Sequence, residues 1–176
     1  MIAKLFEVKE TKDKGKGLFA NVFIPTGTII CFECEKCKVL SKKEISELDK
    51  TKRNFVLEHA YTRKDGTYLM PCGEEIYLNH SCNSNILDSG LGFDIVVRNI
   101  NIGEEATYDY RQFYDDSSYE MICNCKEKNC CKIVKCIHPV PKELRNFWNV
   151  KIKKSLTLIN TVNQPLKNTS LFHPDK

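Results

Sequence analysis

Residues 103–110 read GEEATYDY and place an aspartate between two tyrosines, Tyr108 and Tyr110. Side chains alternate between the two faces of an extended strand, so both phenol groups are expected on one face. Aromatic rings with polar tips serve packing more often than catalysis. The meaning of this stretch therefore depends on the segments before and after it.

Downstream, residues 123–130 read CNCKEKNC, with three cysteines separated by polar and charged residues. Cysteine is among the most buried residue types, so a place in the core is one interpretation. The polar loop favours a metal instead, because closely spaced thiolates can face one ion and zinc usually takes four ligands. We expect a zinc site whose fourth ligand comes from elsewhere in the chain.

Two shorter motifs lie upstream. Residues 79–82 read NHSC, which by itself would be a polar turn after the apolar residues 76–78. Residues 14–19 read KGKGLF, and the two glycines would let the backbone pass close to a ligand. Each motif alone is more typical of an ordinary turn than of a binding site.

Glycine and proline divide the rest of the first 109 residues into short apolar runs, which predict strands at residues 4–9, 17–23, 28–32 and 93–97. Residues 64–66 suit a hairpin-like turn.

Helices are expected at two places. Ser41 and Glu44 are spaced as a capping box, which predicts a short helix over residues 41–49 that runs toward Phe55 and Leu57. Pro141 suits the first turn of an amphipathic helix. Residues 163–176 show little apolar periodicity and predict a loosely held tail.

Composition excludes several classes of protein. The 176 residues suit one domain, and 41% hydrophobic with 28% charged residues is typical of a globular chain. No apolar run could span a bilayer, and residues 1–10 lack a secretory signal, so we expect an intracellular protein without a membrane partner, in either nucleus or cytoplasm. The net charge of +4 is mild and spread out, which gives direct nucleic-acid binding little support. Ten cysteines in a reducing compartment indicate metal ligands or free thiols.

In their order and separation, the four motifs resemble those of the SET-domain protein-lysine N-methyltransferases from about residue 4 to residue 136. The resemblance implies a mainly β fold with short helices, the β-clip-like SET fold. In it the NHSC and tyrosine-rich segments thread into a pseudoknot, and a zinc-binding post-SET segment and a C-terminal helix follow. The expected units are the SET domain at residues 4–115, the post-SET segment at 119–136, and the helix and tail at 137–176.

The resemblance also implies a reaction, the transfer of a methyl group from S-adenosylmethionine to a lysine of a histone tail or another basic protein. Tyr110 would be the catalytic tyrosine. Tyr108 would limit the number of methyl groups, which predicts monomethylation. Tyr61 and Tyr68 are candidates for the lysine channel. The cofactor would be held by Gly15, Lys16, Gly17, Leu18, Asn79 and His80.

The family's zinc takes the cysteine of the NHSC motif as its fourth ligand, so the implied set is Cys82, Cys123, Cys125 and Cys130. The net negative charge of four thiolates would be offset in part by Lys126, Lys128 and Lys132. The acidic residues Asp115, Asp116 and Glu120 would either attract a basic peptide or form a solvated loop. Phe147 and Trp148 would either cover the ligands or dock the final helix.

The sequence departs from the family pattern at Ile76, where many relatives have arginine, and this change would weaken contacts with the cofactor. It also departs at Ser84, Ala106 and Cys131, where the changes are easier to tolerate. The spacing of Cys31, Cys34 and Cys37 is compatible with a second metal site. Because only three cysteines are present and they lie inside the catalytic region, we interpret them as free thiols. The same interpretation applies to Cys72, Cys131 and Cys136.

Two other functions compete with the enzyme. A catalytically silent SET module that binds protein or chromatin would keep the fold and the zinc, although the joint presence of Asn79, His80 and Tyr110 argues against it. A small zinc-binding interaction protein outside the SET family would explain the cysteines and leave the other motifs to coincidence.

Overall fold

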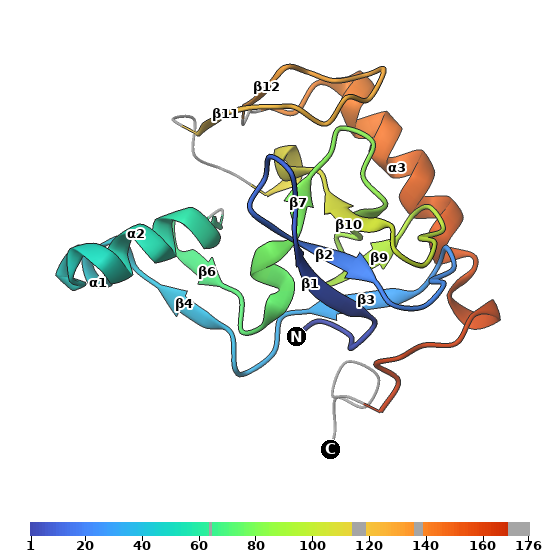
Figure 1. The fold of residues 1–176 in the computed structure, drawn as a ribbon, viewed down its shortest axis with the longest axis horizontal. Coiled ribbons are helices and arrows are strands. Elements are labelled where there is room, and N and C mark those ends of the chain that lie inside the picture. The colour runs from blue at the N-terminus through green and yellow to red at the C-terminus, as the bar shows by residue number, and fades with distance from the viewer. Residues whose placement is uncertain (64, 114–118, 136–138, 169–176) are drawn as a thin grey trace.

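The computed structural model of the protein describes residues 1–63, 65–113, 119–135 and 139–168 (Figure 1). Its strands are β1 (Phe6–Glu10), β2 (Lys16–Ala20), β3 (Ile29–Phe32), β4 (Lys38–Leu40), β5 (Tyr61–Thr62), β6 (Tyr68–Met70), β7 (Asn79–His80), β8 (Ile86–Asp88), β9 (Phe93–Val96), β10 (Glu105–Tyr108), β11 (Glu120–Ile122) and β12 (Ile133–Lys135). Its helices are α1 (Lys42–Glu47), α2 (Lys50–His59) and α3 (Lys142–Leu156), with short 3-10 turns η1 (Glu74–Tyr77), η2 (Tyr110–Gln112) and η3 (Ile159–Thr161). The expectation of a mainly β protein with short helices is confirmed.

The central sheet has the strand order β1-β2-β10-β8-β9-β3, and β7 also pairs with β10. Strand β10 is therefore the junction of the sheet, antiparallel to β2 and parallel to β7 and β8. It carries the middle of the GEEATYDY stretch, and its residues 106–108 are buried. The strand ends at Tyr108, so Tyr110 lies in η2 and not on the strand face that the alternation predicted.

The main core lies against this sheet. All four residues of β3 are buried, as expected for a continuous apolar run that is covered on both faces. They pack with Leu18, Ile86 and Val96 from the neighbouring strands, and with Ala106 and Tyr108 of β10. The tyrosine-rich stretch is thus built into the core.

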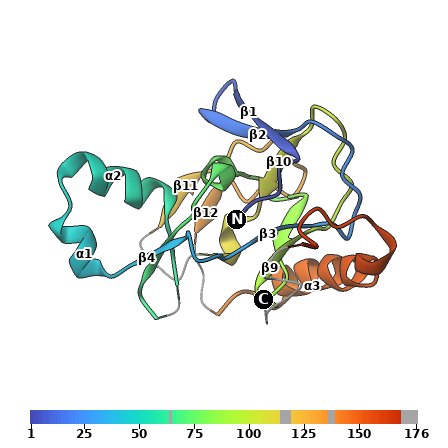
Figure 2. The same cartoon turned by 90° about the horizontal axis from the view of Figure 1, so that it is seen from below.

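Residues 38–70 form a separate lobe, in which the three-stranded sheet β4-β6-β5 carries α1 and α2. Figures 1 and 2 both show this lobe projecting to one side of the central sheet. Ile45, Val56 and Ala60 form its own small core. The described residues of the turn between β5 and β6 close a hairpin, as predicted, and Lys64 of that turn lies outside the described residues.

The capping box predicted at Ser41 is present. The Glu44 backbone N–H donates to Ser41 Oγ at 3.2 Å, and the Glu44 carboxylate accepts from the Ser41 backbone N–H at 2.7 Å. The helix ends earlier than expected, because Leu48 is extended and Asp49 caps a second helix through the Lys52 backbone N–H at 2.9 Å. Two short helices therefore replace the predicted single one that continued toward Phe55.

Helix α3 begins at Lys142 with Pro141 at its N-cap, close to the predicted start. Trp148 and Ile152 are buried against Leu87 and Ile95 of β8 and β9. Trp148 therefore docks the helix on the sheet, the second of its two expected roles. Among the described residues, no helix combines the length and the apolarity needed to cross a membrane.

The prediction of a loose tail from residue 163 is wrong for residues 164–166. Leu166 is buried in the main core. The buried Gln164 carboxamide accepts from the Ile29 backbone N–H at 2.8 Å and donates to the Gly27 carbonyl at 2.9 Å. Apolar periodicity could not reveal this contact, because a single amide side chain attaches the segment to backbone groups far away in the sequence. Residues 169–176 lie outside the described part of the chain.

Replacing Gln164 should therefore destabilise the fold. Gln164→Ala leaves the Ile29 N–H and the Gly27 carbonyl buried without this partner, and we expect unfolding to become easier by about 2–4 kcal/mol. The measurement is urea unfolding followed by circular dichroism. Asn163→Ala is the matched control, because Asn163 is exposed next to it in the chain. Equal stability of the two variants would contradict the assignment.

Candidate functional site

The NHSC segment and the tyrosine-rich segment lie side by side. In the parallel pairing of β7 with β10, Asn79 is opposite Thr107 and His80 is opposite Tyr108. At the end of β10 the backbone N–H of Tyr110 donates to His80 Nδ1 at 3.2 Å. The two segments that the sequence pattern singled out thus form one site.

The glycine-rich segment joins this site through Asn79. Its side-chain amide donates to the Lys16 carbonyl at 3.0 Å and to Glu105 Oε1 at 2.9 Å. A Cβ on Gly17 would lie 2.9 Å from the Glu105 carboxylate and 3.0 Å from Asn79 Nδ2. Gly17 is therefore required by the close approach of the protein's own side chains. Gly15, with a φ of +67° and nothing within 4 Å of its would-be Cβ, faces open space.

A pocket, here named the tyrosine pocket, opens beside the end of β10. It is lined by Cys31, Glu58, His59, Tyr61, Pro71, Glu75, Ile76, Leu78, Asp94, Tyr108, Tyr110 and Phe113. The ring of Phe113 packs on Tyr108 with centroids 4.0 Å apart and on Tyr61 with centroids 4.9 Å apart. Tyr61, a candidate for the lysine channel, thus lines this pocket. Tyr68 packs instead against the small core of the lobe.

Tyr110 contributes its hydroxyl group to the pocket. The hydroxyl donates to the Leu78 carbonyl at 2.6 Å. Burial raises the pKa of Tyr110, and nearby Tyr119 and Glu105 raise it further. The phenol is therefore neutral at physiological pH and is not a phenolate base.

Three acidic side chains in the pocket wall escaped the sequence analysis, namely Glu58, Glu75 and Asp94. A second pocket adjoins the first through Cys31, Tyr61, Glu75, Asp94 and Phe113, and it adds Glu33 and Asp88 to the acidic groups. The one available signal was Asp94 itself, a carboxylate in the otherwise apolar run of β9. Part of this acidic charge is already paired, because Arg63 contacts Glu33 at 3.1 Å and the Met1 amino group contacts Glu75 at 3.4 Å.

Tyr108 and Asp94 form a buried pair. The Tyr108 hydroxyl donates to Asp94 Oδ1 at 2.8 Å, and Tyr108 is 1% exposed. Burial raises the pKa of Asp94 from its ordinary value of 3.8 to about 7, although the bond from Tyr108 opposes this. Desolvation and the Asp94 charge together raise the pKa of Tyr108. The hydroxyl group of Tyr108 is thus fixed at the pocket wall.

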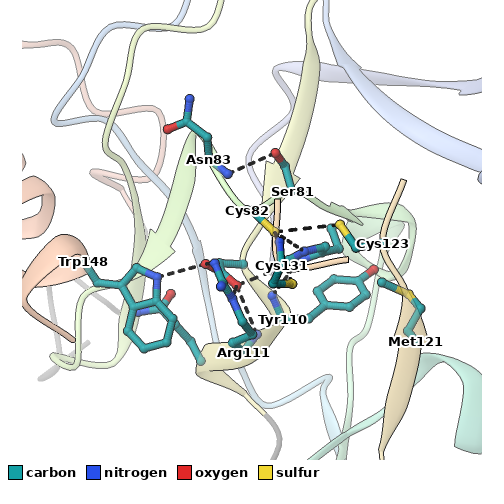
Figure 3. A network of polar contacts seen from close by, with 12 residues as sticks. Ser81, Cys82, Asn83, Tyr110, Arg111, Met121, Cys123, Cys131 and Trp148 are labelled. Carbon is teal, nitrogen blue, oxygen red and sulfur yellow. Dashed lines mark hydrogen bonds and ion pairs between the residues drawn. The ribbon is translucent and has the colours of Figure 1, made fainter. Parts of the chain in front are cut away.

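Behind the tyrosines, the carboxylate of Asp109 is 1% exposed and fully paired. The Arg111 guanidinium donates to both of its oxygens, at 2.8 and 2.6 Å, and the Trp148 indole N–H donates to Oδ2 at 2.9 Å. Figure 3 shows Arg111 and Trp148 converging from η2 and α3. Asp109, between the two tyrosines, therefore helps to hold the final helix in place through Trp148.

His80 is buried, and burial lowers the pKa of its ring to about 4 against the opposing effect of Asp109. The ring is therefore neutral at physiological pH. Because Nδ1 accepts from the Tyr110 N–H, the ring proton is on Nε2, which lies 3.4 Å from Cys82 Sγ. His80 thus faces the cysteines as an N–H donor, and its side chain points into the protein.

The four cysteines expected to hold zinc come together. The sulfur atoms of Cys82, Cys123, Cys125 and Cys130 all lie within 4.8 Å of one another. Cys123, Cys125 and Cys130 lie in the loop between β11 and β12, and Cys82 follows β7. Val134 of β12 packs against the cluster. Burial raises the pKa of the Cys125 thiol, but backbone hydrogen bonds from Cys82 and Glu127, with side-chain bonds from Cys123 and Cys130, lower it to about 7. A thiol with this pKa is readily available as a thiolate.

Cys131 belongs to the same cluster, which the interpretation of it as an isolated free thiol missed. Its Sγ lies 3.4 Å from that of Cys82 (Figure 3). A second quartet of His80, Cys82, Cys123 and Cys131 therefore also has metal-ligand spacing. The Nε2 proton of His80 disfavours this quartet, because a metal-binding imidazole nitrogen must be unprotonated.

Other expected residues lie elsewhere. Glu120 is exposed and forms an ion pair with Lys135 across the hairpin. Asp115, Asp116 and Cys136 fall outside the described residues. Lys126, Lys128 and Lys132 are exposed. Cys31 donates a hydrogen bond to Glu75 at 3.1 Å. Cys34 and Cys37 are not grouped with it but lie beside Cys72.

The Asp94 pKa predicts a pH dependence of stability. Below about pH 4 the carboxyl is protonated in both folded and unfolded states. Between about pH 4 and 7 only the unfolded state releases the proton. The free energy of unfolding of wild type should therefore fall by roughly 2–4 kcal/mol relative to that of Asp94→Asn as the pH rises. Urea unfolding across pH 4–8 measures the difference. Asp13→Asn, on an exposed turn, is the control. Parallel curves for wild type and Asp94→Asn would refute the buried carboxyl.

The sequence matches the family model described as SET domain over residues 15–111. Similar proteins include the variant-silencing SET domain-containing protein of Plasmodium falciparum, 27% identical over 189 residues that cover 97% of this chain and 7% of that protein. The probable histone-lysine N-methyltransferase set-23 of Caenorhabditis briggsae is 29% identical over 150 residues, covering 74% of this chain and 61% of that protein. The chain thus spans less than two thirds of the length of either relative.

Solved structures agree in fold. Kryptonite, in complex with mCHG DNA and SAH, has a TM-score of 0.52 at 22% identity, over 73% of this chain and 28% of that one. The methyltransferase domain of human SETMAR has a TM-score of 0.50 at 23% identity, over 72% of this chain and 56% of that one. These identities concern the fold alone. Because the family model covers more than half of its residues, the chain belongs to the SET domain family.

Proposed function

We propose that this SET-domain protein transfers a methyl group from S-adenosylmethionine to a lysine side chain of a histone tail or another basic protein. The observation that carries the proposal is the position of the Tyr110 hydroxyl. It donates to the Leu78 carbonyl at the wall of a pocket that also holds Tyr61, Tyr108 and acidic groups. The relatives named as histone-lysine N-methyltransferases support the same reaction.

The bound cofactor would supply a methyl group on a sulfonium, and the amine nitrogen of lysine would displace the thioether. The N–C bond forms as the C–S bond breaks, so the protein's main task is to align the amine with the methyl carbon. Lysine has an ordinary pKa of about 10.4, so its ammonium must first lose a proton. The neutral Tyr110 phenol would lie next to the amine and help to orient it toward the methyl carbon.

The cofactor would lie along residues 15–18 and beside Asn79. These segments are joined by the Asn79 hydrogen bond to the Lys16 carbonyl, and Gly15 leaves room next to them. Because the His80 side chain is occupied inside the protein, its contribution would come from its backbone. The segment fits a ligand that approaches from the Gly15 side.

The acidic groups of the two pockets favour a basic substrate. Glu58, Glu75 and Asp94 line the tyrosine pocket, and Glu33 and Asp88 line the adjoining one. Glu33 and Glu75 are already paired with Arg63 and the Met1 amino group, so Glu58 and Asp88 are the groups that would attract an entering lysine. These groups support a substrate rich in lysine and arginine, such as a histone tail, and would serve in place of the acidic residues near position 115.

We further propose a zinc ion on Cys82, Cys123, Cys125 and Cys130, whose sulfur spacing suits tetrahedral coordination. The ion would join the NHSC segment to the β11–β12 hairpin. His80 Nε2–H would then donate to the Cys82 thiolate and partly offset its charge, as outer-shell donors do at metal sites.

Loss of the Tyr110 hydroxyl should stop methyl transfer. With labelled S-adenosylmethionine, core histones and ribosomal proteins, we expect wild type to label a lysine and Tyr110→Phe to be slower by about 100-fold or more. Tyr68→Phe, in the lobe core away from the pockets, is the matched control. Mass spectrometry locates the methyl group. Full activity of Tyr110→Phe would overturn the assigned role. If wild type fails to bind the cofactor at all, a silent binding module is the better description.

Loss of the Tyr108 hydroxyl should change the product. The hydroxyl fixed by Asp94 takes up space at the pocket wall, which supports monomethylation by wild type. We expect Tyr108→Phe to remain active and to produce lysines with two or three methyl groups. The readout is the distribution of methyl states in the same substrate peptide. An unchanged distribution at comparable turnover would contradict the role of Tyr108.

A further inference from the structure

Three cysteines far from the proposed zinc site also gather at one point. The sulfur atoms of Cys34, Cys37 and Cys72 lie within 4.8 Å of one another, and those of Cys34 and Cys72 are 3.6 Å apart. Thiolates on a tetrahedral zinc ion, each about 2.3 Å from the metal, are separated by about 3.8 Å. The spacing of the three sulfurs is therefore that of metal ligands.

The local backbone supports this arrangement. Cys34 and Cys37 form a Cys-x-x-Cys turn, closed by a hydrogen bond of 2.9 Å from the Cys37 N–H to the Cys34 carbonyl. Cys72 comes from a distant segment and completes the group from the other side. A Cys-x-x-Cys pair with further ligands from a distant segment recurs at zinc sites, and zinc also binds three protein ligands with a water in the fourth position.

Packing explains these residues only in part, since Cys34 alone among them contacts the main core. Cysteine is usually buried when it serves as a small apolar side chain. Here Cys72 is exposed and the other two are partly exposed. By contrast, Cys31 in the same stretch is buried, and its thiol donates to Glu75. The cluster thus differs in kind from the core cysteine next to it.

The cluster lies where the chain passes between the central sheet and the lobe of residues 38–70. Cys34 and Cys37 occupy the connection from β3 to β4, on the way into the lobe. Cys72 occupies the connection from β6 to η1, on the way out. A metal bound to all three would tie both connections together at the base of the lobe.

We propose that Cys34, Cys37 and Cys72 bind a second zinc ion, which fixes the lobe to the central sheet. Three thiolates select a soft or borderline metal, and water completes the tetrahedron at the exposed side. The site is adjacent to the tyrosine pocket, because Cys31, Pro71 and Glu75 line that pocket and Glu58 and Tyr61 reach it from the lobe. The second ion would thus help to fix the side of the tyrosine pocket that the lobe and its connections form.

Metal content tests the proposal without reference to enzymatic activity. The full chain, expressed with zinc and purified under reducing conditions, should contain two zinc ions per chain by elemental and native mass spectrometry. Cys34→Ser and Cys72→Ser should each retain one, Cys125→Ser should also retain one, and Cys34→Ser with Cys125→Ser should retain none. Cys31→Ser is the matched control and should retain two. Circular dichroism verifies that each variant is folded.

A second measurement uses wild type alone and so does not depend on the folding of variants. Zinc should protect Cys34, Cys37 and Cys72 from iodoacetamide until a chelator is added, as located by peptide mass spectrometry. Hydrogen exchange of residues 38–70 should rise in Cys72→Ser, with β11–β12 unchanged. One zinc per wild-type chain that Cys125→Ser loses, two zinc ions retained by Cys72→Ser, bound copper in place of zinc, or a Cys34–Cys72 disulfide would each overturn the proposal.

Discussion

The buried carboxylate of Asp109 is the constraint on which the rest of the site depends. A charge that is 1% exposed is tolerated in a protein core only when it is fully paired. Arg111 and the Trp148 indole supply the pairing, so the turn after β10 and the position of α3 are both determined by this one group. The tyrosines on either side of Asp109 are thereby held at the pocket.

The same network extends toward the cysteines. The Tyr110 backbone donates to His80, which directs its remaining N–H at Cys82. The Asn129 side chain donates to the Cys82 carbonyl at 3.1 Å, and Lys151 of α3 donates to Asn83 at 2.8 Å. Tyr110, the cysteines around Cys82 and the final helix are therefore parts of one polar framework.

Both cysteine clusters lie between segments that are distant in the sequence. The first joins the NHSC segment to the β11–β12 hairpin, and the second joins the two connections of the lobe. Val134 is the buried aliphatic residue of the first cluster, and Cys34 of the second contacts the main core from a partly exposed position. Coordination would supply there the rigidity that hydrophobic packing supplies in the central sheet.

The sequence by itself determined what depends on local chemistry or on a recurrent order of motifs. The capping box at Ser41, the helix that carries Trp148, the strands of the first third and the quartet around Cys82 were all predictable, because their signals lie within a few residues or in a known pattern. Only the tertiary structure revealed Asp94 beside Tyr108, Cys131 beside Cys82, Cys72 beside Cys34 and the attachment of Gln164. Each of these contacts joins residues at least 14 positions apart. Their proximity follows from strand pairing and chain crossings, for which a single sequence carries no periodic signal.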